Sequence, residues 1–218
     1  MSIGWYCLDN DIILKLATCN IFDETLITLA INYSQVNILE TAKHKFRSLK
    51  KRQRGKGSGN YNLESALAIT GACSKISDEK ISQYIFTQLQ SIEGIDVGES
   101  ILISYVIHLN QQDNPSYLLT GDKRCLRALA LANEIAEVKQ CLDCKVWCLE
   151  QLVLKNIEVH GFDFVKQNIV PVRDCDQVLK VAFGSGELSM LTKTREVLIS
   201  YIQDLRQETG NLLNSYPE

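Results

Sequence analysis

The sequence predicts an α/β fold: an α/β/α sandwich with a mostly parallel central sheet, followed by a C-terminal helical extension. Three observations support this. Short apolar segments alternate with helical patterns up to about residue 150, which is typical of a parallel sheet. Beyond Glu150 the strand patterns stop and helical spacing continues to Gly210. The length of 218 residues suits one large domain with an extension. We therefore expect a domain over residues 1–155 and a helical extension over 156–218 packed on it.

The first expected elements are a strand over residues 4–8 ("GWYCL") and a helix over 11–19, with Asp11 as its N-cap. A second helix covers about 24–32. The stretch 34–51 carries apolar residues at helical spacing and predicts a third helix, which would hold Glu40. It runs into "RQRGKGSGN", where three glycines and several charges indicate an exposed loop.

The remaining elements follow the same reasoning from apolar spacing and turn residues. The expected strands are "SYLLT" and "KVWCL", and the expected helices after the basic loop lie at about 62–75, 77–92, 99–110, 123–136, 150–158, 161–169 and in a long run that reaches Gly210. That last run places Leu188, Leu191, Arg195, Leu198, Ile202 and Leu205 on one mostly apolar stripe.

Composition narrows the class of protein. Hydrophobic residues make up 45% and charged residues 22%, as in an ordinary globular protein. The sequence contains no run of eighteen apolar residues, so no membrane span is expected. The N-terminus lacks the features of a signal peptide. We therefore expect a cytoplasmic protein whose eight cysteines are free thiols. The cluster "CLDCKVWC" holds one CxxC without a second pair, which is a weak zinc signal.

Positive charge is concentrated in one segment of a chain whose net charge is −3. Residues 41–63 contain no Asp or Glu but eight of the 23 basic residues. Such a concentration predicts contact with phosphate, and the residues expected to bind substrate are Lys50, Lys51, Arg52 and Arg54. The alternative is a solvated helix end followed by a loop, because cations suit a helix C-terminus.

Several acids could meet at one edge of the predicted sheet. Asp9 and Asp122 each follow a strand, and the carboxyl ends of parallel strands share an edge, where ligands bind. Glu40 and Glu99 lie on expected helices that could line the same edge. Hard cations such as Mg²⁺ and Mn²⁺ prefer these oxygen ligands. The alternative for each acid is structural; Asp122, for example, could simply cap a helix.

At this point the sequence resembles the PIN domain family. The resemblance is carried by "CLDNDIILKLA", by Glu40 in "VNILETAKH", by "VGESILISYVIHL" and by "YLLTGDKRCLRALA", in that order and over about residues 3–150. Glu99 would occupy the third acidic position of the family. The second position could be held by Glu40 or by Glu64.

The resemblance implies a metal-dependent endoribonuclease that cleaves single-stranded RNA, often the toxin of a toxin–antitoxin pair. Asp9, Glu40, Glu99 and Asp122 would be catalytic, with Mg²⁺ or Mn²⁺ held chiefly by Asp9, Glu99 and Asp122, and Thr120 would position water or phosphate. The alternatives are a non-catalytic PIN fold that binds RNA or protein, and a structure-specific DNA nuclease. An antitoxin or regulatory protein and a homodimer stay open as partners.

Overall fold

A five-stranded parallel sheet forms the centre of the protein, whose computed structural model describes residues 4–53, 61–77, 81–133 and 135–217. The strand order is β3-β2-β1-β4-β5, and every neighbouring pair is parallel. This confirms the predicted α/β class and the parallel sheet with C-terminal helices. The strands are β1 Trp5–Leu8, β2 Val36–Ile38, β3 Ser74–Lys75, β4 Ser116–Leu119 and β5 Val146–Trp147.

Helices fill the connections and the C-terminal part. Their bounds are α1 Asn10–Thr18, α2 Phe22–Thr28, α3 Ala42–Gln53, α4 Leu63–Ala72, α5 Gln83–Gln90, α6 Val97–Gln111, α7 Lys123–Leu131, α8 Ala136–Leu142, α9 Leu149–His160, α10 Phe162–Ile169, α11 Gln177–Ala182 and α12 Leu191–Thr209. Short 3₁₀ turns add η1 Tyr33–Gln35, η3 Val170–Cys175, η4 Gly186–Leu188 and η5 Gly210–Leu212.

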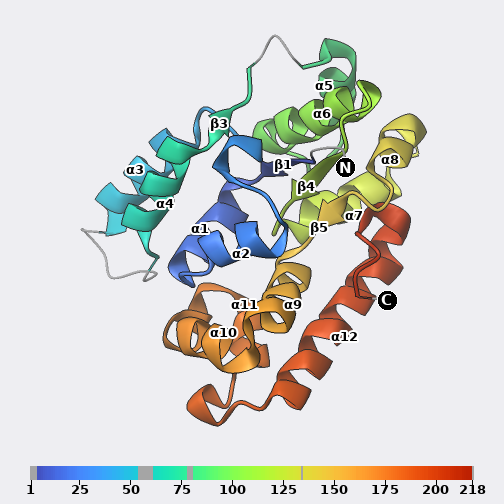
Figure 1. Cartoon of the computed structure of the whole chain (residues 1–218). Helices are drawn as coiled ribbons and strands as arrows, with labels where there is room; N and C mark the ends of the chain where they lie inside the picture. Colours follow the sequence, from blue (N-terminus) through green and yellow to red (C-terminus); the bar gives the residue numbers. More distant parts are fainter. Residues whose placement is uncertain (1–3, 54–60, 78–80, 134, 218) are drawn as a thin grey trace.

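The connections place helices on both faces of the sheet. From β1 through β2 to β3 the strands step in one direction, and the chain then returns to the other side of β1 for β4 and β5. Because parallel crossovers are right-handed, this reversal puts α1 to α4 on one face and α6 to α8 on the other. In agreement, α1 packs on α4 while α6 lies against β1 and β4 (Figure 1).

The expected helix over 34–51 is wrong in its first part, which forms η1 and β2 instead. Val36, Asn37 and Ile38 are all buried, because β2 pairs with β1 on one edge and with β3 on the other. The apolar spacing suited a helix equally well, and only long-range strand pairing decided the outcome. Glu40 therefore lies in an exposed turn before α3 and not on a helix.

Two smaller boundaries also differ from expectation. The first helix begins at Asn10, and its N-cap is Asp9, whose side chain accepts the backbone N–H of Ile12 at 2.6 Å. Asp11 lies in the first turn of that helix and does not cap it. The strand β3 falls within the stretch expected to be helical at 62–75, because it completes the edge beside β2.

The C-terminal helices pack on the α/β part. Helix α9 contacts α2, and α12 runs back along α9, α11 and α7 (Figure 1). Leu198, Ile202 and Leu205 of the predicted stripe are buried. Its first part was placed wrongly, because α12 begins only at Leu191 and Leu188 lies in η4, 83% exposed. The division at residues 155 and 156 falls inside α9 and stays a prediction.

The chain end covers one edge of the sheet. The backbone N–H of Asn214 donates to the carbonyl of Val146 in β5 at 2.7 Å, and that of Cys144 donates to Asn211 at 2.7 Å. Val146 and Leu213 form an isolated parallel bridge. The unpaired backbone groups of an edge strand can form hydrogen bonds with other chains. Residues 211–214 cover the β5 edge and so prevent such pairing there. Within the ranges described, no helix is both long enough and apolar enough to cross a membrane.

Candidate metal and nucleic-acid site

The strand order reverses between β1 and β4, at the centre of the sheet. In open α/β sheets, ligands bind outside the carboxyl ends of the strands at such a reversal point. Asp9 directly follows β1, and Thr120 and Asp122 directly follow β4. The topology therefore brings these three residues to the position where a ligand is expected.

A pocket of about 230 Å³ lies at this point and is lined by side chains from several elements. It contains three of the four predicted catalytic acids, namely Asp9, Glu99 and Asp122. Neither Glu40 nor the alternative Glu64 lines it. Its lining residues are Asp9, Asn10, Asp11, Leu39, Thr41, Lys45, Asp96, Gly98, Glu99, Leu102 and Asp122.

Asp9 is buried, with an exposed fraction of 7%, and both of its carboxylate oxygens accept hydrogen bonds. One oxygen accepts from the backbone of Ile12 at 2.6 Å. The other accepts from the Thr120 hydroxyl and from the backbone N–H of Gly121 at 3.1 Å. Thr120 in turn accepts from the backbone N–H of Asp122 at 3.0 Å. The Thr120 hydroxyl thus ties the end of β1 to the end of β4.

Glu99 reaches the pocket through the start of α6. Asp96 and Glu99 form a reciprocal capping box: the Glu99 N–H donates to Asp96 at 2.8 Å, and the Asp96 N–H donates to Glu99 at 2.7 Å. This arrangement satisfies two backbone donors that a helix start leaves open. It also holds the Glu99 carboxylate, which is only 8% exposed, in one orientation.

Asp122 is the N-cap of α7, as the simpler interpretation of the sequence expected. One carboxylate oxygen accepts from the backbone N–H groups of Arg124 at 2.9 Å and Cys125 at 3.0 Å. The side chain is nevertheless 31% exposed and lines the pocket, so capping and a role at the site are compatible.

Gly121 gives the site its close packing. A Cβ atom at this position would lie 2.2 Å from Oδ2 of Asp11, which is far shorter than any real contact. Asp11 can therefore lie against the turn after β4 only because residue 121 has no side chain.

Several carboxylates lie close together in the pocket, and this shifts their pKa values. Burial, with the neighbouring charge of Asp11, raises the pKa of Asp9 to about 6. Burial, with the carboxylate of Asp122, raises the pKa of Glu99 to about 7. Burial by itself would raise the pKa of Asp122, but hydrogen bonds from Cys125 and Glu99 lower that pKa below its ordinary value. A cation would relieve this repulsion.

Two lysines lie beside the acids. Lys15 bridges the carboxylates of Asp11 at 2.6 Å and Asp176 at 2.7 Å, which joins the edge of the pocket to the C-terminal part. Lys45 reaches the pocket from α3 and is exposed. It is the basic residue of the predicted phosphate-binding segment that lies in the pocket lining.

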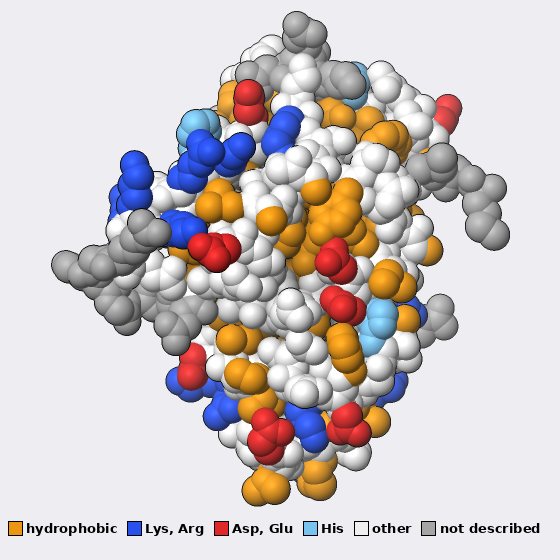
Figure 2. Space-filling model, turned by 60° about the vertical axis from the view of Figure 1, so that its left-hand side comes forward, with side chains coloured by type: hydrophobic (Ala, Val, Ile, Leu, Met, Phe, Trp, Pro, Cys, Tyr) orange, Lys and Arg blue, Asp and Glu red, His pale blue; other side chains and the backbone are white. Residues whose placement is uncertain are grey.

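The basic segment forms one exposed surface on α3. Figure 2 shows Lys and Arg side chains gathered where this helix lies. A shallow groove of about 590 Å³ runs along it, lined by His44, Arg47, Ser48, Lys50 and Lys51. Of the predicted substrate-binding residues, Lys51 and Arg52 are exposed and Lys50 pairs with Glu64 at 2.7 Å. Arg54 lies outside the described residues.

Three charged pocket residues are not among the predicted site residues. Asp96 is one of them, yet the spacing Asp96-Val-Gly-Glu99 is a capping-box pattern that could have placed it beside Glu99. The sequence predicts Asp11 as a helix cap and not as a pocket residue. Lys45 could not be singled out from the other basic residues, because the local pattern does not show which of them faces the pocket.

The donor set suits a hard divalent cation in its chemistry. All candidate ligands are carboxylate oxygens, and Mg²⁺ typically takes one or two direct carboxylates with water in its other positions. Among the described residues, no group of three His, Cys, Asp or Glu side chains is arranged to hold a metal ion as it stands. The carboxylate oxygens of Asp9, Glu99 and Asp122 instead accept hydrogen bonds within the fold. These residues therefore suit an ion that keeps several of its water ligands.

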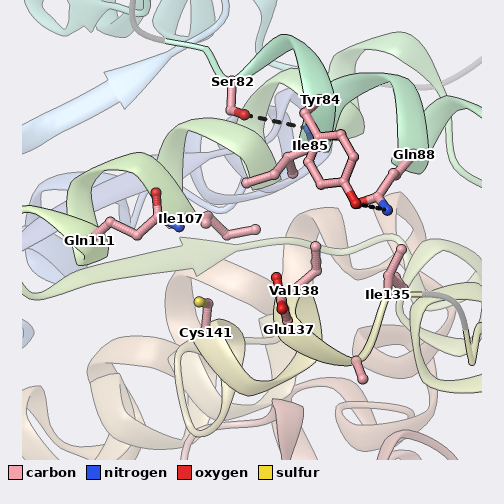
Figure 3. A pocket seen from close by; sticks show the side chains of 11 residues that line it. Ser82, Tyr84, Ile85, Gln88, Ile107, Gln111, Ile135, Glu137, Val138 and Cys141 are labelled. Atoms are coloured by element: carbon pink, nitrogen blue, oxygen red, sulfur yellow. Dashed lines mark hydrogen bonds between the residues drawn. The ribbon is translucent and has the colours of Figure 1, made fainter.

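A second cavity lies away from the acids, between α5, α6 and α8. It measures about 430 Å³, and apolar side chains such as Ile85, Ile107 and Val138 line it together with Tyr84 and Gln88 (Figure 3). The Gln88 amide donates to the Tyr84 hydroxyl at 3.0 Å at its rim. None of the predicted site residues lies here.

Fold and site together define an α/β protein with a five-stranded parallel sheet and an acidic pocket at its reversal point. Comparison of the chain with protein-family models, curated proteins and solved structures gave no match. The class is therefore defined by the fold and the pocket alone.

Proposed function

We propose that the protein is a PIN-type, divalent-metal-dependent endoribonuclease that cleaves phosphodiester bonds of single-stranded RNA. The observation that carries the proposal is the convergence of Asp9, Glu99 and Asp122, from three separate segments, in one pocket at the reversal point of the sheet. A cytoplasmic location and an antitoxin-type or second-copy partner, both expected from the sequence, belong to the same proposal.

Asp9, Glu99 and Asp122 are the residues that would hold Mg²⁺ or Mn²⁺. A bound ion of this kind supplies a polarised phosphoryl oxygen and a water of lowered pKa. Asp9 is oriented for binding by Thr120 and Gly121, and Glu99 by its capping box with Asp96. Because these contacts hold the side chains before substrate arrives, little ordering remains for the reaction itself.

The basic surface on α3 would hold the RNA backbone. Lys45 lies in the pocket lining, while Arg47, Lys50 and Lys51 line the neighbouring groove. A strand that follows this helix would bring a phosphate past Lys45 toward the acids. Thr120 is engaged with Asp9, so we assign it the positioning of that carboxylate.

The experiment is cleavage of labelled single-stranded RNA and single-stranded and branched DNA by the purified full-length chain, with Mn²⁺, with Mg²⁺ and with EDTA. We expect RNA cleavage that needs the metal and stops in EDTA. Cleavage of DNA alone would replace the proposal by the structure-specific DNA nuclease.

A non-catalytic RNA-binding protein of the same fold is the second candidate. Two observations favour it. The carboxylates of Asp9, Glu99 and Asp122 accept hydrogen bonds within the fold. In the described part of the chain, no three side chains form a ready metal group. RNA binding by the full chain without cleavage in any metal would support this candidate and reject the nuclease.

A further inference from the structure

Two cysteines that are 156 residues apart in the chain lie side by side, and neither lines the acidic pocket. Cys19 follows the last residue of α1 as its C-cap, and Cys175 ends η3 in the C-terminal part. Their Sγ atoms are 3.9 Å apart, in hydrogen-bonding contact. Helix α1 and η3 pack against each other, so the contact belongs to an ordered interface.

We propose that Cys19 and Cys175 are a redox modification site: a dithiol that hydrogen peroxide converts into a disulfide joining α1 to the C-terminal helices. Disulfide sulfurs are bonded at about 2.05 Å, so each sulfur needs to move by only about 1 Å, which side-chain rotation can supply. The proposal does not depend on the nuclease function.

The two thiols differ in the way that such a pair requires. Cys175 is partly exposed, so peroxide can reach it, whereas Cys19 is buried. The hydrogen bond from Cys19 lowers the pKa of Cys175, and the ammonium of Lys15 acts in the same direction. The same contact, together with burial, raises the pKa of Cys19. Peroxide-sensing cysteines are typically accessible thiolates next to a resolving cysteine.

The reaction has two steps. The Cys175 thiolate attacks one oxygen of hydrogen peroxide, which forms an S–O bond, breaks the O–O bond and releases hydroxide, which takes up a proton as water. The Cys19 thiol then attacks the sulfenic sulfur, which forms the S–S bond and releases a second water as the S–O bond breaks. Two thiols are oxidised and one peroxide is reduced, and no further reactant is needed.

The charged neighbours tie this pair to the acidic pocket. Asp176, next to Cys175, accepts from Lys15 at 2.7 Å, and Lys15 also binds Asp11 in the pocket lining. The disulfide would therefore join α1 to the C-terminal part, which the Lys15 ion pairs already connect.

The test is a peptide map of the reduced full-length protein after treatment with hydrogen peroxide and blocking of the remaining thiols. Trypsin separates the two cysteines onto peptides 16–43 and 174–180, each of which contains one cysteine. We expect these peptides to become linked, the linkage to be reversed by dithiothreitol, and the count of free thiols in denaturant to fall from eight to six.

Variants separate the roles of the two residues. In Cys19→Ala, Cys175 should form a sulfenic acid that dimedone traps, and in Cys175→Ala, Cys19 should stay reduced. Cys144→Ser removes an exposed cysteine elsewhere and should leave the linkage unchanged. The linked protein should melt at a higher temperature than the reduced protein, because the bond constrains the unfolded chain.

Three results would overturn the proposal. One is that the Cys19 and Cys175 thiols both stay free at peroxide concentrations that oxidise the exposed Cys144. Another is a linkage between other cysteines, such as Cys141 and Cys144, with none between Cys19 and Cys175. The third is a Cys19–Cys175 linkage that lowers the melting temperature, since that would show that the bond forms through local unfolding and not from this geometry.

Discussion

Asp122 has two tasks at the scale of the single residue, as the N-cap of α7 and as one of the three predicted metal ligands in the pocket. The substitution Asp122→Asn separates them. Asn caps helices about as well as Asp, so the fold should be kept, but the amide removes the charge that holds a cation. We expect RNA cleavage to fall by about 100-fold or more, since even indirect metal contacts cost 10–100-fold.

The control for this variant is the melting temperature without metal, which should be unchanged or slightly higher because one negative charge has left the acidic pocket. Asp122→Ala should instead cost about 1 kcal/mol through loss of the cap. Full cleavage by Asp122→Asn at limiting Mn²⁺ would contradict the role assigned to this carboxylate.

The acids of the pocket should also make the metal-free protein sensitive to pH. The pKa of Asp9 is raised to about 6 and that of Glu99 to about 7, above the values of about 4 expected in the unfolded chain. Between about pH 4 and 7 the folded state therefore binds more protons than the unfolded state. Stability from this source is present at the acid end and is lost as pH rises through the window.

Urea unfolding in EDTA at pH 5 and pH 8 measures this effect. For Asp9 the loss over the whole window is at most about 3 kcal/mol, and the part that falls between pH 5 and pH 8 is smaller. Asp9→Asn should flatten the pH dependence, because the amide cannot titrate. The contrary result is a free energy of unfolding that changes with pH equally in the wild type and in Asp9→Asn. It would show that the acids are not crowded in solution.

At the scale of the element, α3 combines a buried side with a basic surface. Ala42 and Phe46 pack into the core, while Lys43, Lys45, Arg47, Lys51 and Arg52 are exposed. This division lets the basic residues be changed without disturbing the fold.

The prediction for α3 concerns the salt dependence of RNA binding. Replacing Lys50, Lys51 and Arg52 by Ser removes up to three phosphate contacts. For a single strand, the slope of log K against log salt should become shallower by about 0.7 per contact, or about 2 in all. A double variant of Lys180 and Lys193, which lie outside α3, provides the charge control. An unchanged slope in the α3 variant would mean that the segment is only a solvated helix end.

At the scale of the whole molecule, the C-terminal helices are packed on the α/β part. Helix α12 contacts α7 and α9, and residues 211–214 cover the β5 edge. Removal of residues 159–218 would uncover this edge and the apolar sides of α7 and α9. We expect the truncated chain to be insoluble when expressed, while any soluble part keeps metal-dependent cleavage because Asp9, Glu99 and Asp122 remain.

A point variant tests the same idea in a chain that folds. Ile202 is fully buried in α12, so Ile202→Ala should cost about 2–4 kcal/mol in urea unfolding. Val181, at 45% exposure on α11, is the matched control, and its change to Ala should cost less than about 0.5 kcal/mol. Cleavage per folded molecule should be unchanged in both. Loss of cleavage in folded Ile202→Ala would place the functional boundary in the C-terminal part.

The sequence by itself determined the α/β class, because apolar segments bounded by turn residues alternate with helical spacing at 4–8, 116–120 and 145–149. It also determined that Asp9 and Asp122 share an edge, since each follows a parallel strand. Both features depend on local patterns and on the geometry common to all parallel sheets.

Only the tertiary structure decided that Val36–Ile38 is a strand, since that segment is held by pairing with β1 and β3 and its local pattern suited a helix equally well. The same pairing put Glu40 in an exposed turn, outside the pocket that Asp11, Asp96 and Lys45 help to line. The contact between Cys19 and Cys175 likewise appears only when η3 packs on α1. Contacts between residues far apart in the chain depend on which buried faces fit together, and this information is spread over the whole sequence.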